Sequence, residues 1–195
     1  MSVEHRAERA SVIPPGRWSV DAPRSSVAFT VKHMVLAKVN GRFSEFGGTL
    51  ETGASGPRAA GVVKAASLDT SESVRDEHLR SSPDFFDVER YPEISFNSTR
   101  IDRPNDGRLH IVGELTMRGI TREIELDAQL GDTTREPGGA ERIELELRGE
   151  LNRKDFGLTW NQTLETGGAL LGNKVKIALD ISAVKREARS TRQAR

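Results

Sequence analysis

Four histidines and a few acidic residues are the side chains of this sequence that could carry acid–base or metal chemistry. The histidines are His5, His33, His78 and His110, and no two of them have the spacing of metal ligands. HExxH, GxSxG and phosphate-loop motifs are all missing. The absence of cysteine excludes disulfides, cysteine-zinc sites and thiol nucleophiles. We therefore predict no catalytic residue, no metal site and no cofactor, and a protein that is not an enzyme.

His33 is the strongest candidate for a functional histidine, because it lies on the apolar face of the alternating segment 25–33. A hydrogen-bonded structural histidine is the commoner interpretation. The alternative, a general base acting on a small apolar substrate, needs a second converging polar group, which the sequence does not show. Asp84 and Asp87 lie on either side of a phenylalanine pair, where a solvated rim is favoured over an acid–base pair. Asp155 could cap a turn or orient Arg153.

The composition indicates one domain with short tails. The 195 residues carry 29 basic and 29 acidic side chains, and this zero net charge argues against a nucleic-acid binder. Residues 1–15 are predicted to be a disordered arm without a signal-peptide apolar stretch, so a cytoplasmic location is expected. The domain should span 16–185. The basic tail at 186–195 is interpreted as solvated or, alternatively, as weakly attracted to an anionic membrane surface.

Period-two alternation dominates the domain and predicts antiparallel strands with one face in water. The segment "RIELELRGEL", for example, places Ile143, Leu145 and Leu147 on one face and acidic residues on the other. Asp106-Gly107 and the segment 118–121 are typical of tight turns, while Asn40-Gly41 could be a turn or lie within a strand. We expect eight main strands, near 25–33, 39–50, 61–69, 92–103, 107–118, 121–131, 141–152 and 173–184.

One helix is predicted near 71–82, with caps at 69–71 and a capping box between Asp69 and Glu72. Pro83 should end it. The apolar face of this helix is only Val74 and Leu79, so the helix must dock on something larger. The pair Phe85-Phe86 follows at once, and we predict an irregular turn that buries both rings, one under the helix and one toward a channel.

Eight strands with polar outer faces have exposed edges, and closure into a barrel removes them. A barrel of this size can be packed or can hold a small ligand. The small residues Gly113, Ala65 and Ala128 interrupt the apolar faces and leave both interpretations open. The connector of about 20 residues at 152–172 favours the second interpretation, because such long apolar connectors are often lids. A further strand with a surface loop is the alternative.

The sequence resembles the YceI-like family of lipocalin-like barrels that bind polyisoprenoids. The resemblance covers about residues 16–185 and rests on "WSVDAPRSSVAFTVKHM", "VNGRFSEFGGTL", "RDEHLRSSPDFFDVERYPEISFNST", "GELTMRGITREIEL", "NRKDFGLTWN" and "LGNKVKIALDISAV". It implies an all-β, eight-stranded antiparallel barrel with one short helix, a channel that buries an isoprenoid chain, and frequent homodimers.

The resemblance also implies the positions that would contact the ligand. These are Phe29, Val31, His33, Phe43, Phe85, Phe86, Phe96, Leu115, Met117, Phe156, Leu158 and Trp160. The leading hypothesis is non-catalytic binding, storage or transport of a polyprenol or prenyl quinone. The alternatives are another amphiphile, such as a fatty acid or fatty amide, and an enzyme that uses His33.

Overall fold

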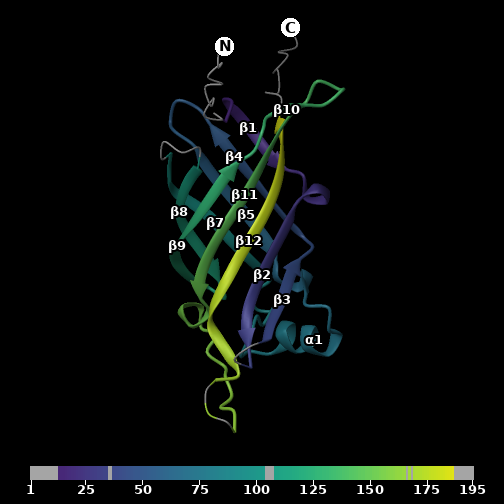
Figure 1. Ribbon diagram of the computed structural model, residues 1–195, viewed down its shortest axis with the longest axis vertical. Coiled ribbons are helices and arrows are strands. Elements are labelled where there is room, and N and C mark those ends of the chain that lie inside the picture. The colour runs from purple at the N-terminus through teal and green to yellow at the C-terminus, as the bar shows by residue number, and fades with distance from the viewer. Residues whose placement is uncertain (1–12, 35–36, 104–107, 166, 168, 187–195) are drawn as a thin grey trace, which may run out of the picture.

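The computed structural model describes residues 13–34, 37–103, 108–165, 167 and 169–186. Strands make up most of the described chain (Figure 1). Their bounds are β1 Gly16–Val20, β2 Ser26–His33, β3 Ala37–Phe43, β4 Phe46–Thr52, β5 Arg58–Lys64, β6 Leu68–Asp69, β7 Glu93–Asp102, β8 Arg108–Met117, β9 Ile120–Leu130, β10 Thr134–Arg135, β11 Glu141–Asn152 and β12 Leu171–Arg186. The α-helix is α1, Ser73–Ser81, and the 3-10 turns are η1 Ala22–Arg24, η2 Ala65–Ser67 and η3 Arg153–Phe156.

Eight of these strands close into an antiparallel barrel in the order β11-β9-β8-β7-β5-β4-β1-β12, and β12 returns to β11. This confirms the predicted fold class. The long β12 makes the closure possible, because it pairs with β11 along 174–184 on one edge. Its other edge is shared between β1 and β2. The hairpin β2–β3 therefore extends the wall beyond the ring, with α1 beside it at the end opposite β1 (Figure 1).

The eight strands of the ring differ from the eight predicted ones. The predicted strand 39–50 is two strands, because the chain bends at 44–45: β3 pairs with β2, while β4 pairs with β1 and β5. The predicted strand 61–69 is β5, a 3-10 turn and β6. The five-residue β1 is too short to show a period in the sequence. The predicted hairpin turn at Asp106-Gly107 lies outside the described residues.

Gly119 and Gly41 are glycines for different structural reasons. Arg118 and Gly119 have φ of 53° and 70°, so the predicted tight turn between β8 and β9 is confirmed. Gly41, in contrast, lies inside β3 rather than in a turn. A Cβ at this position would lie 2.2 Å from Cζ of Phe29, so glycine is required there by the close approach of a ring.

Alternation of buried and exposed residues follows the sequence pattern most closely in β9. Ile124, Leu126, Ala128 and Leu130 are buried there, while the residues between them are exposed. The core is formed by such inward faces on β8, β9 and β11, together with Trp18 of β1 and Phe156 of η3.

The helix α1 is shorter than predicted and begins with a different cap. Ser71 has φ of 63°, which a helix excludes, and the carboxylate of Glu72 accepts hydrogen bonds from the backbone of Val74 and Arg75. The predicted capping box with Asp69 is therefore wrong, since the carboxylate of Asp69 accepts from Ser71 instead. Pro83 follows the helix end, as predicted.

The docking of α1 is mainly polar. Val74, predicted to lie on its apolar face, is 76% exposed. The Arg75 guanidinium donates to the hydroxyl and carbonyl of Thr70, and the buried Asp76 accepts from Thr70. Arg80 donates to the Leu68 carbonyl. These bonds fix the helix to the β6 segment, so a short helix with little apolar surface is held in place.

Candidate ligand-binding cavity

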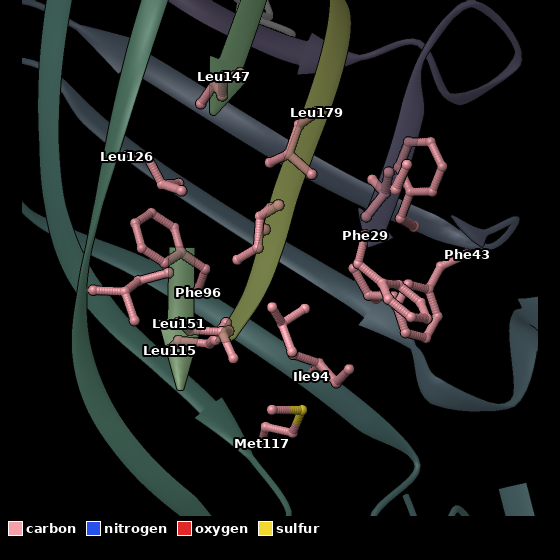
Figure 2. Close-up of a pocket in the computed structure, with 18 of the residues that line it drawn as sticks. Phe29, Phe43, Ile94, Phe96, Leu115, Met117, Leu126, Leu147, Leu151 and Leu179 are labelled. Carbon is pink, nitrogen blue, oxygen red and sulfur yellow. The ribbon is translucent and has the colours of Figure 1, made fainter. Parts of the chain in front are cut away.

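An apolar cavity of about 500 Å³ lies inside the barrel. Ring strands, β2, β3, α1 and the segment before β12 all contribute to its wall. Figure 2 shows side chains from several strands converging on this space, among them Phe96, Leu115, Leu126, Leu147 and Leu179. The drawn side chains are hydrocarbon except for the sulfur of Met117 (Figure 2). The cavity can therefore take up an apolar molecule, and it offers such a molecule few polar contacts.

Small residues keep the interior open, but they are not the ones predicted. Gly113, Ala65 and Ala128 are buried without lining the cavity. Ala28, Gly48, Ala59 and Gly61 line it instead. Gly113 acts indirectly, because a Cβ there would lie 2.4 Å from Cζ of Phe96, so the glycine lets this ring lie against β8. The runs "FGGTL" and "RAAGVV" were the sequence signal for a hollow wall on β4 and β5.

The structure brings most of the predicted ligand-contact residues together. Those that line the cavity are Phe29, Val31, His33, Phe43, Phe85, Phe86, Phe96, Leu115, Met117, Leu158 and Trp160. Phe156 is the exception, since this last residue of η3 is 1% exposed and packs in the core. Ile13, which the sequence placed in the arm, is buried and lines the cavity. Contact of these residues with a ligand stays a prediction.

The phenylalanine pair lies in an irregular turn after α1, as predicted. The Phe85 amide donates to Ser82 O and the Phe86 amide to Leu79 O, so the chain turns back on the helix end. This geometry lets both rings point inward, where successive residues of a strand would point to opposite faces. Phe85 is 7% exposed and Phe86 is half-buried, so the predicted burial of both rings is confirmed fully only for Phe85. Both rings line the cavity, whereas only one was predicted to point toward it.

Phe85 and Phe86 each contact further aromatic rings. The Phe85 ring contacts His78 of α1 and Trp160 of the connector, with centroid distances of 5.3 Å and 5.4 Å. The Phe86 ring contacts Phe43 of β3 at 6.0 Å, edge to face. The pair therefore joins the helix, the connector and the β2–β3 extension at one end of the cavity.

Arg153 organises the connector at the same end of the cavity. Its Nε donates to Gly172 O over 2.8 Å, and its Nη1 donates to the carbonyls of Leu158 and Trp160. The side chain of Asn161 adds a second tie, because its amide both donates to and accepts from the backbone of Leu171. Burial lowers the pKa of Arg153. In the sequence analysis Arg153 appeared only as a possible partner of Asp155, and no motif indicated this role.

The predicted lid is present only at the two ends of the connector. Leu158 and Trp160, and then Leu170 and Leu171, line the cavity. Between them the described residues project past the end of the barrel (Figure 1), with an isolated bridge between Thr163 and Ala169.

The remaining candidates for chemistry are dispersed. His33 and His78 line the cavity, whereas His110 lies on the outer face of β8 and contacts Asp127. Asp84 and Asp155 are exposed, Asp87 is half-buried, and none of the three lines the cavity. His5 lies outside the described residues. Within the described ranges, no group of three or more acidic or imidazole ligands could hold a metal ion, and no helix is long and apolar enough to cross a bilayer.

A model of the YceI-like domain matches residues 18–183, which is nearly all of the barrel. The chain belongs to the YceI-like family. A curated relative, a UPF0312 protein from Staphylococcus aureus, is 32% identical over 163 residues, covering 82% of this chain and 92% of the relative.

Solved structures share the fold. The Campylobacter jejuni YceI protein is 25% identical and superposes with a TM-score of 0.69 over 80% of this chain and 90% of that one. Burkholderia cenocepacia BcnA gives 0.71 at 18% identity, over 84% and 98% of the two chains. A polyisoprenoid binding domain from Saccharophagus degradans gives 0.64 at 17% identity, over 87% and 98%.

Proposed function

We propose that this YceI-like protein binds a long-chain isoprenoid lipid, a polyprenol or a prenyl quinone, in its cavity and stores or transports it without chemical change. One observation carries the proposal: the barrel encloses a cavity of about 500 Å³ with an almost entirely apolar wall. A space of this kind, if filled only by water, would leave its wall poorly solvated, whereas a hydrocarbon chain suits it.

Burial of the chain would supply the binding energy. Each CH₂ transferred from water to an apolar surrounding contributes about 0.8 kcal/mol, so a chain of many carbons offsets the cost of its own ordering. The Saccharophagus degradans structure with the same fold is described as a polyisoprenoid binding domain, which supports this ligand class over other apolar molecules.

The arrangement of the titratable lining residues supports a carrier over an enzyme. These residues are His33, Arg75, His78 and Arg153. Within the described residues no hydrogen bond joins any two of them, and a general base needs a partner that orients it. We therefore propose that His33 contributes polarity to the wall rather than proton transfer.

Native mass spectrometry of the purified protein, followed by organic extraction, tests the proposal. We expect a co-purifying isoprenoid lipid that is recovered chemically unchanged. Recovery of a fatty acid or fatty amide would replace the ligand class but keep the carrier function. Turnover of an added lipid that is abolished by His33→Ala would contradict the carrier function. The homodimer and the cytoplasmic location stay predictions, which light scattering and cell fractionation would test.

A further inference from the structure

The lysines of the described chain divide into those that are neutralised by a carboxylate and those that are not. The lysines that form an ion pair with a glutamate are Lys64, Lys174, Lys176 and Lys185. The remaining lysines, Lys32, Lys38 and Lys154, are exposed, and their ammonium groups form no ion pair or hydrogen bond within the described ranges. Their positive charges are therefore available to a partner outside the chain.

These unpaired lysines lie together at one end of the barrel. Lys32 of β2 and Lys38 of β3 are directly opposite each other in the register of the two strands. Lys32 and Lys154, which belongs to η3, line the same recess of about 250 Å³. The hairpin β2–β3 and the connector meet at the end of the barrel opposite β1 (Figure 1). Unneutralised positive charge is therefore concentrated at the connector end.

The recess lies outside the barrel wall and is separate from the cavity. Lys32 alternates along β2 with Val31 and His33, which line the cavity, so its side chain points to the outer face. The amide side chains of Asn161 and Asn173 add polar groups to the recess. None of the residues that line it is acidic.

Electrostatics favours an anion on this face. Like charges directly opposite each other across a strand pair destabilise the pair, and this is the arrangement of Lys32 and Lys38. Asp155 and Glu165 of the connector are exposed, but neither lines the recess. An external anion between the lysines would therefore relieve a repulsion that the described side chains leave in place.

An exposed apolar side chain borders the lysines. Met34 follows β2 directly and is 54% exposed. Its amide donates to the carbonyl of Leu170 over 2.8 Å, and Leu170 lines the recess. Lysines beside an exposed apolar side chain suit the surface of an anionic bilayer, where phosphates lie just outside the acyl chains.

We propose that the connector end of the barrel docks on an anionic bilayer, with lipid phosphates beside Lys32, Lys38 and Lys154 and with Met34 in the interfacial layer. The proposal names a partner surface and does not depend on which molecule the cavity holds. Leu170 and Leu171 line both the recess and the cavity, so docking would bring the bilayer next to one end of the cavity.

Vesicle binding of the full chain tests the proposal. We would compare flotation with vesicles of phosphatidylcholine alone and of phosphatidylcholine mixed with phosphatidylglycerol, at about 0.1 M and about 1 M salt. At the lower salt the mixed vesicles should bind at least about tenfold more tightly, and the higher salt should remove this difference. Equal binding to both vesicles at the lower salt would overturn the proposal. Calorimetric binding of inorganic phosphate without binding to vesicles would show a site for small anions and would also overturn it.

Paired substitutions locate the contact. Lys32→Gln/Lys154→Gln should weaken binding to the mixed vesicles at least about tenfold, since each lysine near an anionic surface contributes about fivefold. Lys64→Gln/Arg100→Gln is the matched control, because these exposed residues belong to β5 and β7, away from β2 and β12 in the sheet. The control removes the same charge and should change binding less than about twofold. Equal losses in the two variants, or undiminished binding of the first, would overturn the assignment to the recess.

A fluorescent label tests the orientation of the docked protein. The sequence has no cysteine, so one introduced thiol can be labelled alone. Met34→Cys places a polarity-sensitive fluorophore beside the recess, and Gln129→Cys places it on the exposed face of β9. On mixed vesicles the emission should shift to shorter wavelength only from position 34. An unshifted emission at position 34, or a shift at position 129, would contradict docking through the connector end.

Discussion

Replacement of Gly61 by leucine should fill the cavity from one wall and so separate stability from ligand binding. Gly61 lies on the inward face of β5 and pairs with Phe96 of β7. A Cβ at position 61 would meet nothing closer than Gly47 O at 3.6 Å, which is ordinary contact. The Phe96 ring leaves this space free because it lies against Gly113 of β8. A leucine side chain can therefore enter the cavity without displacing the backbone.

Two effects raise the free energy of unfolding of the ligand-free variant. Glycine inside a strand costs roughly 0.5–1 kcal/mol relative to alanine. Full burial of a leucine side chain contributes about 1.5–3 kcal/mol, and burial against a wall that still borders empty space contributes less. We expect a net stabilisation of about 1–2 kcal/mol. The same side chain takes space from the ligand, so the affinity for a prenyl quinone should fall at least about tenfold, or about 1.4 kcal/mol.

Urea unfolding of delipidated protein measures the first quantity, and a fluorescence titration with a prenyl quinone measures the second. Asn97→Leu is the matched control, because Asn97 is the exposed neighbour of Phe96 on β7 and does not line the cavity. It should change affinity less than about twofold. Unchanged affinity in Gly61→Leu would refute the assignment of the cavity as the binding site, and a loss of stability above about 1 kcal/mol would show that the space is not free.

Three further perturbations address the aromatic corner, the connector and the charged loop. Phe85→Ala should lower the free energy of unfolding by about 3 kcal/mol, which is at the low end for a buried ring because one side of this ring borders the cavity. Phe86→Ala should lower it by less, because Phe86 is only half-buried. Urea unfolding tests this, and a loss under about 1 kcal/mol in both variants would show that the pair is no anchor. Trp160 lines the cavity and Trp18 does not, so Trp160→Phe should remove most of the fluorescence change on lipid binding. An undiminished change would exclude the connector from the site. Arginine partners hold the pKa of Glu136 below its ordinary 4.5, so the stability from this carboxylate is present above pH 4.5 and lost as pH falls through the lowered pKa. Glu136→Gln should reduce the change of the urea midpoint between pH 7 and pH 3. An unchanged pH dependence would contradict a contribution of the Glu136 carboxylate to stability.

Several local features of this protein follow from its amino-acid sequence alone. The alternation of apolar and charged residues in β9 and β11 fixed which face would be buried, since a strand alternates sides whatever its partners are. Pro83 fixed the end of the helix, and Arg118-Gly119 fixed a turn, because both follow from the backbone angles that these residues allow. Most of the ligand-contact positions that the family resemblance implied also line the cavity, Phe156 excepted.

The choice of strands that close the ring, and the contents of the interior, depend on long-range contacts. The division of one edge of β12 between β1 and β2 depends on pairings between residues more than a hundred positions apart, which no local period encodes. The same closure placed Phe156 in the core instead of the cavity wall, drew Ile13 into the interior and buried the charge of Arg153. A cavity forms only where side chains from several strands face one another without filling the space between them. The alternation within one strand therefore cannot distinguish a packed barrel from a barrel that contains a cavity.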